Sequence, residues 1–347
     1  MVSDLLDGVR AGKPRAIARM ISQVENDAAA AQTAVTALYA YTGQAHIVGV
    51  TGSPGSGKST LVNELAKAFR TRDLSVGIIA VDPSSPFTGG AILGDRVRMR
   101  DLSGDKGIFI RSLATRGSLG GLSRATAAAL KVLDAAGFDL ILVETVGAGQ
   151  AEVDIANAAH TTLVIEAPGM GDDIQSIKAG ILEIADILVV NKADRPGASR
   201  TVKSLEMMLH LGPAGGMREQ AAYQTMAHHG RLESVMMPAD GNDPTDNGGW
   251  EVPVLETVAT EGAGIEALAE QVMVHRQNLK ETGLWLNREK DRSRYEMQLM
   301  LQDKFMARLA TAVPAANREA LITAVARRET DPYTAVDELM SQLERSF

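Results

Sequence analysis

The sequence contains no cysteine, which excludes disulfide bonds, metal sites built from thiolates and catalysis by a thiol nucleophile. It has no apolar run that approaches the about 18 residues a membrane-spanning helix needs. It also has no excess of basic residues, because 35 Lys and Arg stand against 43 Asp and Glu, a net charge of −8 with neutral histidines. A nucleic-acid-binding face is therefore not expected, since such a face is basic.

The first residues do not resemble a targeting sequence. Met1–Asp7 is polar and acidic, whereas a secretory signal starts basic and then turns apolar, and organelle transit peptides are rich in Arg and poor in acidic residues. Together with the absence of cysteine, this predicts a cytoplasmic protein that binds neither membranes nor nucleic acid.

The length and the hydrophobic pattern predict an α/β fold. The chain has 347 residues, enough for about two domains or for one large α/β domain with appendages. Apolar runs alternate with helical stretches, which is typical of a doubly wound, mostly parallel sheet flanked by helices. The predicted strands are His46–Thr51, Val76–Val81, Gly107–Ile110, Leu140–Val143, Thr162–Glu166 and Ile187–Val190. Val252–Val258 is a candidate last strand, and Pro253 within it is expected either on an edge strand or at a strand start.

We predict three regions along the chain. Residues 1–45 form an N-terminal helical segment, in which Ile17, Met20, Ile21 and Val24 recur at helical spacing. Residues 46–275 form the nucleotide-binding domain, with a long Gly- and Pro-containing insertion at about 212–250, and residues 276–347 form a helical region. Within that last region, Leu286–Leu309 is expected to be one helix. One face of this helix is apolar and consists of Met297, Met300, Leu301 and Phe305. This face either covers a small satellite core or serves as a dimerisation arm.

The strongest motif is a phosphate-binding loop. The eight residues Gly52–Ser59, with the sequence GSPGSGKS, match G-x-x-x-x-G-K-[ST] between a predicted strand and a predicted helix. Glycines let backbone N–H groups point at phosphate oxygens, and the helix N-terminus adds partial positive charge. Lys58 is expected to bridge the β- and γ-phosphates and the Ser59 hydroxyl to bind Mg²⁺. The predicted phosphate-binding residues are Gly52, Ser53, Pro54, Gly55, Ser56, Gly57, Lys58, Ser59 and Thr60.

A second motif indicates guanine. Asn191-Lys192-Ala193-Asp194 ends a predicted strand and matches N-K-x-D. The carboxylate of Asp194 is acceptor-only and suits the N1–H and N2–H₂ donors of guanine, whereas adenine offers neither donor on that edge. Asn191 is expected either to contact N7 or O6 of the base or to hold the loop in place, and the Lys192 stem to cover the ring.

Acidic residues at strand ends predict a Mg²⁺ site. Glu144 ends an apolar strand, and Gly147, three residues later, has an N–H placed to contact the γ-phosphate. Asp82 ends another predicted strand. The six histidines of the chain do not have the spacing of a metal site. We expect Mg²⁺, bound with GTP or GDP, to be the metal that the protein uses.

In combination these segments, with Gly89–Met99, Val143–Gln150 and Pro168–Asp172, resemble the MeaB/ArgK-type GTPases, which are chaperones of adenosylcobalamin-dependent acyl-CoA mutases. The resemblance implies a homodimer with N-terminal helices, a central P-loop GTPase domain and a C-terminal helical dimerisation arm. It implies slow GTP hydrolysis that the mutase stimulates, with Lys58, Asp82, Asp95, Glu144 and Gly147 as the catalytic residues. The implied Mg²⁺ ligands are Ser59, Asp82, Asp95 and Glu144.

The resemblance also implies a relay loop and further base contacts. Asp172, Gln175 and Lys178 would pass the nucleotide state to the mutase, and Ala259 and Thr260 would contact the base. The insertion at 212–250 is longer than the family pattern suggests and leaves the client open among methylmalonyl-, 2-hydroxyisobutyryl-, isobutyryl- and ethylmalonyl-CoA mutases. No motif for binding cobalamin itself is present.

Two alternative functions stay open on the sequence. One is a GTPase that delivers a metal to a nickel or cobalt enzyme, which would call for clustered His or Cys ligands. The other is an ATPase or kinase linked to amino-acid transport, which would call for a preference for ATP. The N-K-x-D motif argues against the second.

Overall fold

The computed structural model describes residues 2–26, 28–82, 100–102, 104–114, 124–145, 151–169, 183–211 and 249–345. The chain divides into two compact units, Met1–Arg292 and Ser293–Phe347, and the boundary falls within the long helix α12 (Leu284–Ala312). The division into three regions at residues 45 and 275 stays a prediction.

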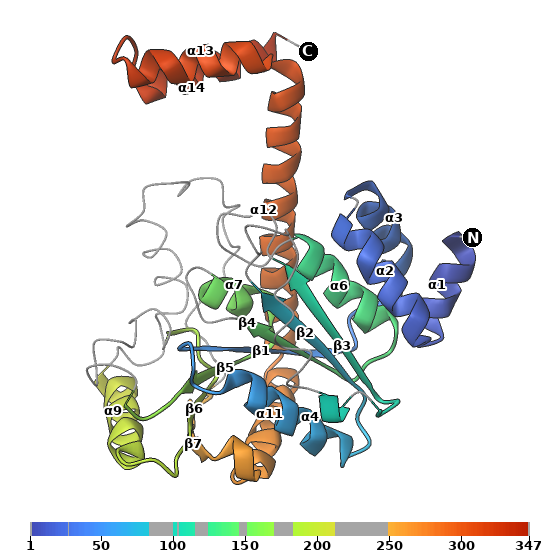
Figure 1. Cartoon of the computed structure of the whole chain (residues 1–347), viewed down its shortest axis with the longest axis vertical. Coiled ribbons are helices and arrows are strands. Elements are labelled where there is room, and N and C mark those ends of the chain that lie inside the picture. Colours follow the sequence, from blue (N-terminus) through green and yellow to red (C-terminus); the bar gives the residue numbers. More distant parts are fainter. Residues whose placement is uncertain are drawn as a thin grey trace. The chain divides into compact units, whose positions relative to one another are not determined.

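The first unit is built on a parallel sheet. In the described residues seven strands run in the order β3-β2-β4-β1-β5-β6-β7, and every neighbouring pair is parallel. This confirms the predicted doubly wound α/β fold (Figure 1). The strands are β1 (His46–Gly52), β2 (Val76–Asp82), β3 (Ile108–Ala114), β4 (Leu140–Thr145), β5 (Thr161–Glu166), β6 (Ile187–Asn191) and β7 (Val254–Thr257).

Each strand differs from its predicted bounds by one or more residues, and the differences are largest in β3 and β7. β3 runs to Ala114, beyond the predicted end at Ile110, and so includes the polar residues Arg111 and Ser112. The Arg111 Nη2 donates to Glu25 Oε2 and to Ser22 Oγ, both at 3.0 Å, so its charge is paired where it meets helix α2 (Pro14–Asn26). The edge strand β7 begins directly after Pro253, which agrees with the expectation that a proline stands at a strand start.

Helices cover both faces of the sheet, because alternate strand residues point to opposite sides. One face carries α1 (Val2–Arg10), α2 (Pro14–Asn26), α3 (Ala28–Leu38), α6 (Arg124–Ala135), α7 (Ala151–Ala158) and α9 (Ala198–Leu211). The other face carries α4 (Lys58–Arg70) and α11 (Ile265–Glu281). The described part of the chain also contains three short 3₁₀ turns, η1 (Tyr39–Tyr41), η2 (Arg100–Leu102) and η3 (Ala259–Glu261).

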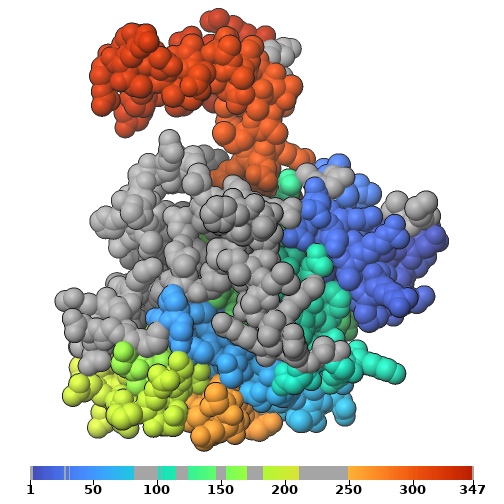
Figure 2. Space-filling view, in the orientation of Figure 1, coloured from blue at the N-terminus to red at the C-terminus, as the bar shows by residue number. Residues whose placement is uncertain are grey.

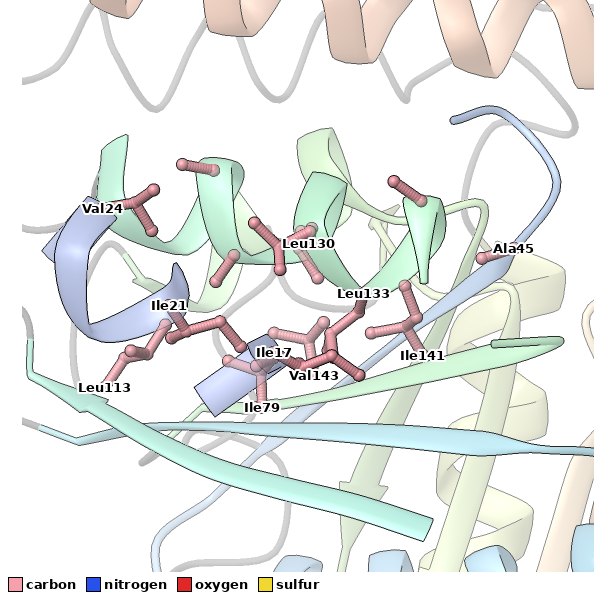
Figure 3. Packing of buried hydrophobic residues seen from close by; sticks show 14 of the residues in the cluster. Ile17, Ile21, Val24, Ala45, Ile79, Leu113, Leu130, Leu133, Ile141 and Val143 are labelled. Atoms are coloured by element: carbon pink, nitrogen blue, oxygen red, sulfur yellow. The ribbon is translucent and has the colours of Figure 1, made fainter. Parts of the chain in front are cut away.

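The N-terminal helices are part of this core. Ile17, Met20, Ile21 and Val24, which the sequence places on one helical face, are all at most 3% exposed and pack with α6 and the sheet (Figure 3). Fully burying such a side chain stabilises the fold by about 1.5–3 kcal/mol. In the space-filling view the blue helices α1–α3 lie directly against the green residues of α6 (Figure 2).

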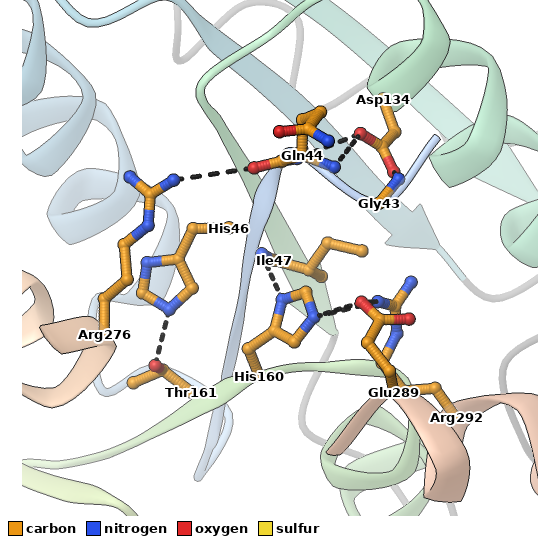
Figure 4. Close-up of polar contacts among 11 residues, drawn as sticks. Gly43, Gln44, His46, Ile47, Asp134, His160, Thr161, Arg276, Glu289 and Arg292 are labelled. Carbon is orange, nitrogen blue, oxygen red and sulfur yellow. Dashed lines mark hydrogen bonds and ion pairs between the residues drawn. The ribbon is translucent and has the colours of Figure 1, made fainter. Parts of the chain in front are cut away.

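A buried polar cluster joins the amino ends of β1 and β5 to α11 and the start of α12. The ring of His160 stacks on Trp285, with centroids 4.0 Å apart. His160 Nδ1 accepts from Ile47 N–H at 2.9 Å, so Nε2 carries the hydrogen and donates to Glu289 Oε1 at 2.7 Å (Figure 4). Thr161 Oγ1 lies 2.7 Å from His46 Nε2 and 2.8 Å from His275 Nδ1. This cluster lies at the opposite edge of the sheet from the phosphate loop.

The second unit consists of the rest of α12 with α13 (Ala315–Ala326) and α14 (Pro332–Glu344). The predicted long helix is present, but Met297, Leu301 and Phe305 are 58%, 62% and 42% exposed. The described residues therefore do not bury this face in a satellite core. None of the described helices is both long and apolar enough to cross a membrane.

Candidate active site

The phosphate loop begins where β1 ends and finishes at the first residue of α4, the context that the motif requires. Gly52 has φ +133°, and a Cβ there would lie 2.0 Å from the carbonyl oxygen of Ile165. Gly57 has φ +95°, and its Cβ would lie 2.4 Å from Asn191 Nδ2. Both positions therefore require glycine, since a side chain would collide with the neighbouring strand ends.

Lys58 lies inside this loop. It is 6% exposed, and its Nζ donates to the carbonyl oxygens of Gly52 at 2.8 Å and Ser53 at 3.0 Å. Pro54, Gly55 and Thr60 are exposed around it. The ammonium group is thus held where the loop would wrap phosphate oxygens, and it can exchange these carbonyl contacts for phosphate.

A hydroxyl and a carboxylate meet beside the loop. Ser59 Oγ donates to Glu144 Oε1 at 2.5 Å, and Glu144 is 6% exposed near the end of β4. Asp82 ends β2 at the same edge of the sheet, since its neighbours Ala80 and Val81 pair with Glu144 and Thr145. Oxygen ligands of this kind suit Mg²⁺, so the described residues fit the predicted metal.

The guanine motif follows β6. Asn191 is 2% exposed and joins three segments: its Nδ2 donates to Ser56 O at 2.8 Å, and its Oδ1 accepts from Thr257 Oγ1 and Ala259 N, both at 3.1 Å. Of the two roles predicted for Asn191, this is the loop-holding one. Lys192 has φ +58°, and its Nζ donates to Gly55 O at 2.6 Å.

The other residues predicted to bind guanine lie at the same edge of the sheet. Asp194 is exposed in the turn after β6, and Ala259 and Thr260 begin η3, which follows β7. Ala193 N donates to Thr257 O at 3.0 Å and joins the two turns. The structure thus brings the N-K-x-D motif, the phosphate loop and the predicted base-contacting turn together. Five predicted residues lie outside the residues that the structure describes: Asp95, Gly147, Asp172, Gln175 and Lys178.

Two residues of the site were missed by the sequence reasoning. Glu166, the last residue of β5, is 5% exposed and accepts hydrogen bonds from Ser53 Oγ in the phosphate loop. It shares with Glu144 and Asp82 the pattern of an acid at the end of a predicted strand, which could have identified it. Thr257 had no local signal, because its contact with Asn191 spans 66 residues. Among the described residues no group of three or more His, Cys, Asp or Glu could hold a metal by itself.

Comparison with known proteins identifies the family. The family model described as methylmalonyl Co-A mutase-associated GTPase MeaB matches residues 16–314. The chain belongs to this family. A Pyrococcus abyssi protein that is named a GTPase is 42% identical over 343 residues, 99% of this chain and 97% of the relative. The predicted MeaB/ArgK resemblance is therefore confirmed, and the chain is a MeaB-family GTP hydrolase that binds GTP and GDP.

Two further similarities concern a fused protein and a solved fold. The fused isobutyryl-CoA mutase of Geobacillus kaustophilus is 35% identical over 240 residues, which are 65% of this chain and 22% of that protein. The crystal structure of LAO/AO transport system kinase covers 99% of this MeaB-family chain and 97% of its own, with a TM-score of 0.66 and 22% identity. The second likeness establishes the fold alone.

Proposed function

We propose that the protein is a Mg²⁺-dependent GTPase that acts as a nucleotide-switched chaperone of an adenosylcobalamin-dependent acyl-CoA mutase. In this role it gates cofactor loading and protects or reactivates the mutase. The observation that carries the proposal is the match to a mutase-associated GTPase family over residues 16–314. It is supported by the relative in which a similar segment is part of a fused isobutyryl-CoA mutase. A cytoplasmic location is part of this proposal.

The described residues suit phosphoryl transfer to water, in which positioning and charge stabilisation supply the catalysis. Lys58 and the loop N–H groups would hold the phosphates, while Asn191 fixes the loop through Ser56. Ser59 and Glu144, with Asp82, would hold Mg²⁺, whose charge neutralises the phosphate oxygens when it is bound. Asp194 would select guanine with its two acceptor oxygens.

Slow turnover by the isolated protein is expected. We identify no arginine in the described residues that is placed as an arginine finger over the phosphate loop. A mutase that orders the catalytic segments would then accelerate hydrolysis, as in other GTPases whose switches are completed by a partner. Asp95 and Gly147 belong to the segments that would be ordered, and Asp172, Gln175 and Lys178 to the proposed relay.

The proposal includes a homodimer formed through the second unit. Met297, Leu301 and Phe305 recur at every fourth position of α12 and are all exposed, so they form an apolar stripe on one helix face. A second copy of the chain is the proposed cover for this stripe.

The test is steady-state GTP turnover by the full chain, alone and with each of four purified mutases loaded with adenosylcobalamin. These are methylmalonyl-, 2-hydroxyisobutyryl-, isobutyryl- and ethylmalonyl-CoA mutase. We expect at least tenfold stimulation by one of them, since partner-completed GTPases gain about 10³–10⁵ in turnover. Unstimulated turnover with all four would refute the chaperone role and leave the GTP hydrolase intact.

Lys58→Ala separates stimulated turnover from contaminating activity. This variant should lose GTP binding and both basal and stimulated turnover, because the loop loses its cation. The matched control is Lys203→Ala, which removes an exposed lysine from α9. If Lys58→Ala kept its affinity for GTP, the assignment of the phosphate site would be wrong.

A further inference from the structure

Glu166 contacts the phosphate loop from the strand next to it. It is the last residue of β5 and is 5% exposed. Ser53 Oγ donates to both of its carboxylate oxygens, at 3.0 Å to Oε2 and 3.2 Å to Oε1. In the sheet register Gly52 pairs with Ile165, so the loop leaves β1 directly beside Glu166.

The other contacts show why this one is needed. The second half of the loop is tied to β6, since Asn191 Nδ2 donates to Ser56 O at 2.8 Å and Lys192 Nζ donates to Gly55 O at 2.6 Å. The start of α4 is tied to β4 through the bond from Ser59 to Glu144. The bond from Ser53 to Glu166 ties the first half of the loop to β5.

The Ser53 backbone has two further partners in the loop. Its carbonyl oxygen accepts from Lys58 Nζ at 3.0 Å and from Ser56 N at 3.2 Å. The orientation of this one peptide therefore affects the position of the Lys58 ammonium group and the N–H of Ser56. Fixing the Ser53 side chain fixes both groups that would face the phosphates.

We propose that Glu166 is a positioning residue for the nucleotide, which acts by holding Ser53 and thereby the first half of the phosphate loop. Hydrogen bonds to a charged acceptor are stronger than neutral ones, and a buried acceptor that loses its donor is costly. A preorganised loop favours binding of GTP and GDP alike. The proposal rests on GTP hydrolysis by this family and does not depend on the mutase.

The test measures KM and kcat for GTP and the dissociation rate of a fluorescent GDP analogue, with no mutase present. The variants are Ser53→Ala, Glu166→Met and their combination. Each single variant should raise KM and the dissociation rate about tenfold, which corresponds to 1.4 kcal/mol, with kcat within about twofold. The double variant should equal the single ones, because both remove the same bond.

Rescue distinguishes positioning from general destabilisation. Glu166→Gln keeps an oxygen that accepts from Ser53, so KM and dissociation should return to within about threefold of the original protein. The matched control is Ser75→Ala, which removes another serine–carboxylate bond, from Ser75 Oγ to Asp139 Oδ2 at 2.7 Å, at the opposite edge of the sheet. It should leave KM and dissociation unchanged.

Three results would overturn the proposal. Unchanged KM and dissociation in Ser53→Ala would do so, and this variant removes a single hydroxyl, so it decides the question even if Glu166→Met does not fold. If the increases in KM and dissociation rate caused by Ser53→Ala and Glu166→Met multiplied in the double variant, the two residues would act independently of each other. Tighter nucleotide binding in both Glu166 variants would mean that the carboxylate acts by repelling phosphate charge.

Discussion

At the scale of the single residue, the site divides into side chains that hold the protein and side chains that are open to a ligand. Asn191 and Lys192 both bond to backbone carbonyls of the phosphate loop. Asp194, two residues further on, is exposed beside them. One four-residue motif thus fixes the loop with its first two members and offers a carboxylate with its last.

This division predicts the outcome of Asp194→Asn. An amide presents a donor as well as an acceptor, so it no longer suits two guanine donors. We expect the ratio of GTP to ATP affinity to fall at least tenfold, while the melting temperature stays within about 1 °C because the side chain is exposed. Competition binding of both nucleotides measures this ratio. An unchanged ratio would count against Asp194 as the base-selecting residue.

At the scale of the element, buried histidines join strands to helices at the edge of the sheet away from the nucleotide. Burial is the main cause that lowers the pKa of His46 and of His160 well below the usual 6.5. Protonating His160 would also replace the acceptor that Ile47 N–H requires with a second donor. The charged and titratable groups that face the two rings are Asp186, His275, Arg276, Lys280, Glu289 and Arg292.

These pKa shifts predict loss of stability in acid. The unfolded chain takes up protons on these histidines near pH 6.5 while the folded chain does not, so this stability is complete above pH 6.5 and falls as the pH drops below it. For each histidine that stays neutral in the folded chain, the unfolding free energy should fall by about 1.4 kcal/mol per pH unit below pH 6.5. Denaturant unfolding at pH 7.5 and pH 5.5 measures the change.

A single variant tests the origin of that loss. In His160→Asn the amide oxygen can still accept from Ile47 N–H, but the side chain does not titrate. The fall in unfolding free energy between pH 7.5 and pH 5.5 should therefore shrink by about half. The same fall in both proteins would mean that His160 is not one of the responsible groups.

At the scale of the whole molecule, the second unit exposes apolar side chains that a single copy does not cover. Besides the α12 stripe, Ile322 on α13 and Val336 on α14 are 60% and 55% exposed. Its buried apolar side chains among the described residues are Val313, Ala335 and Leu343. So small a core gives little stability to a unit of this size, which supports a partner surface.

We therefore predict that the stripe of Met297, Leu301 and Phe305 controls assembly. The intact protein should have the mass of two chains of 36.8 kDa each. Leu301→Glu with Phe305→Glu should weaken the dimer about hundredfold or more, because each buried apolar side chain contributes about 1.5–3 kcal/mol. Sedimentation equilibrium measures this. Gln302→Glu, an exposed change on the same helix, is the control, and a monomeric intact protein would contradict the prediction.

The sequence by itself determined those features that depend on residues close together along the chain. The phosphate loop between strand and helix, the buried face of α2 and the parallel α/β class follow from local spacing, since hydrophobic periodicity and glycine positions depend only on near neighbours. The extension of β3 through Arg111 did not follow, because its charge is paired by Glu25, 86 residues away.

The tertiary structure decided which strand ends surround the loop. The order β3-β2-β4-β1-β5-β6-β7 places Glu144 on one side of the loop and Glu166 and Asn191 on the other. The same order brings His46 and His160 together at the far edge. Lateral strand order arises from packing between distant segments, and a local pattern carries no record of it. The contact of Glu166 with the phosphate loop and the meeting of the buried histidines are therefore visible only in the folded chain.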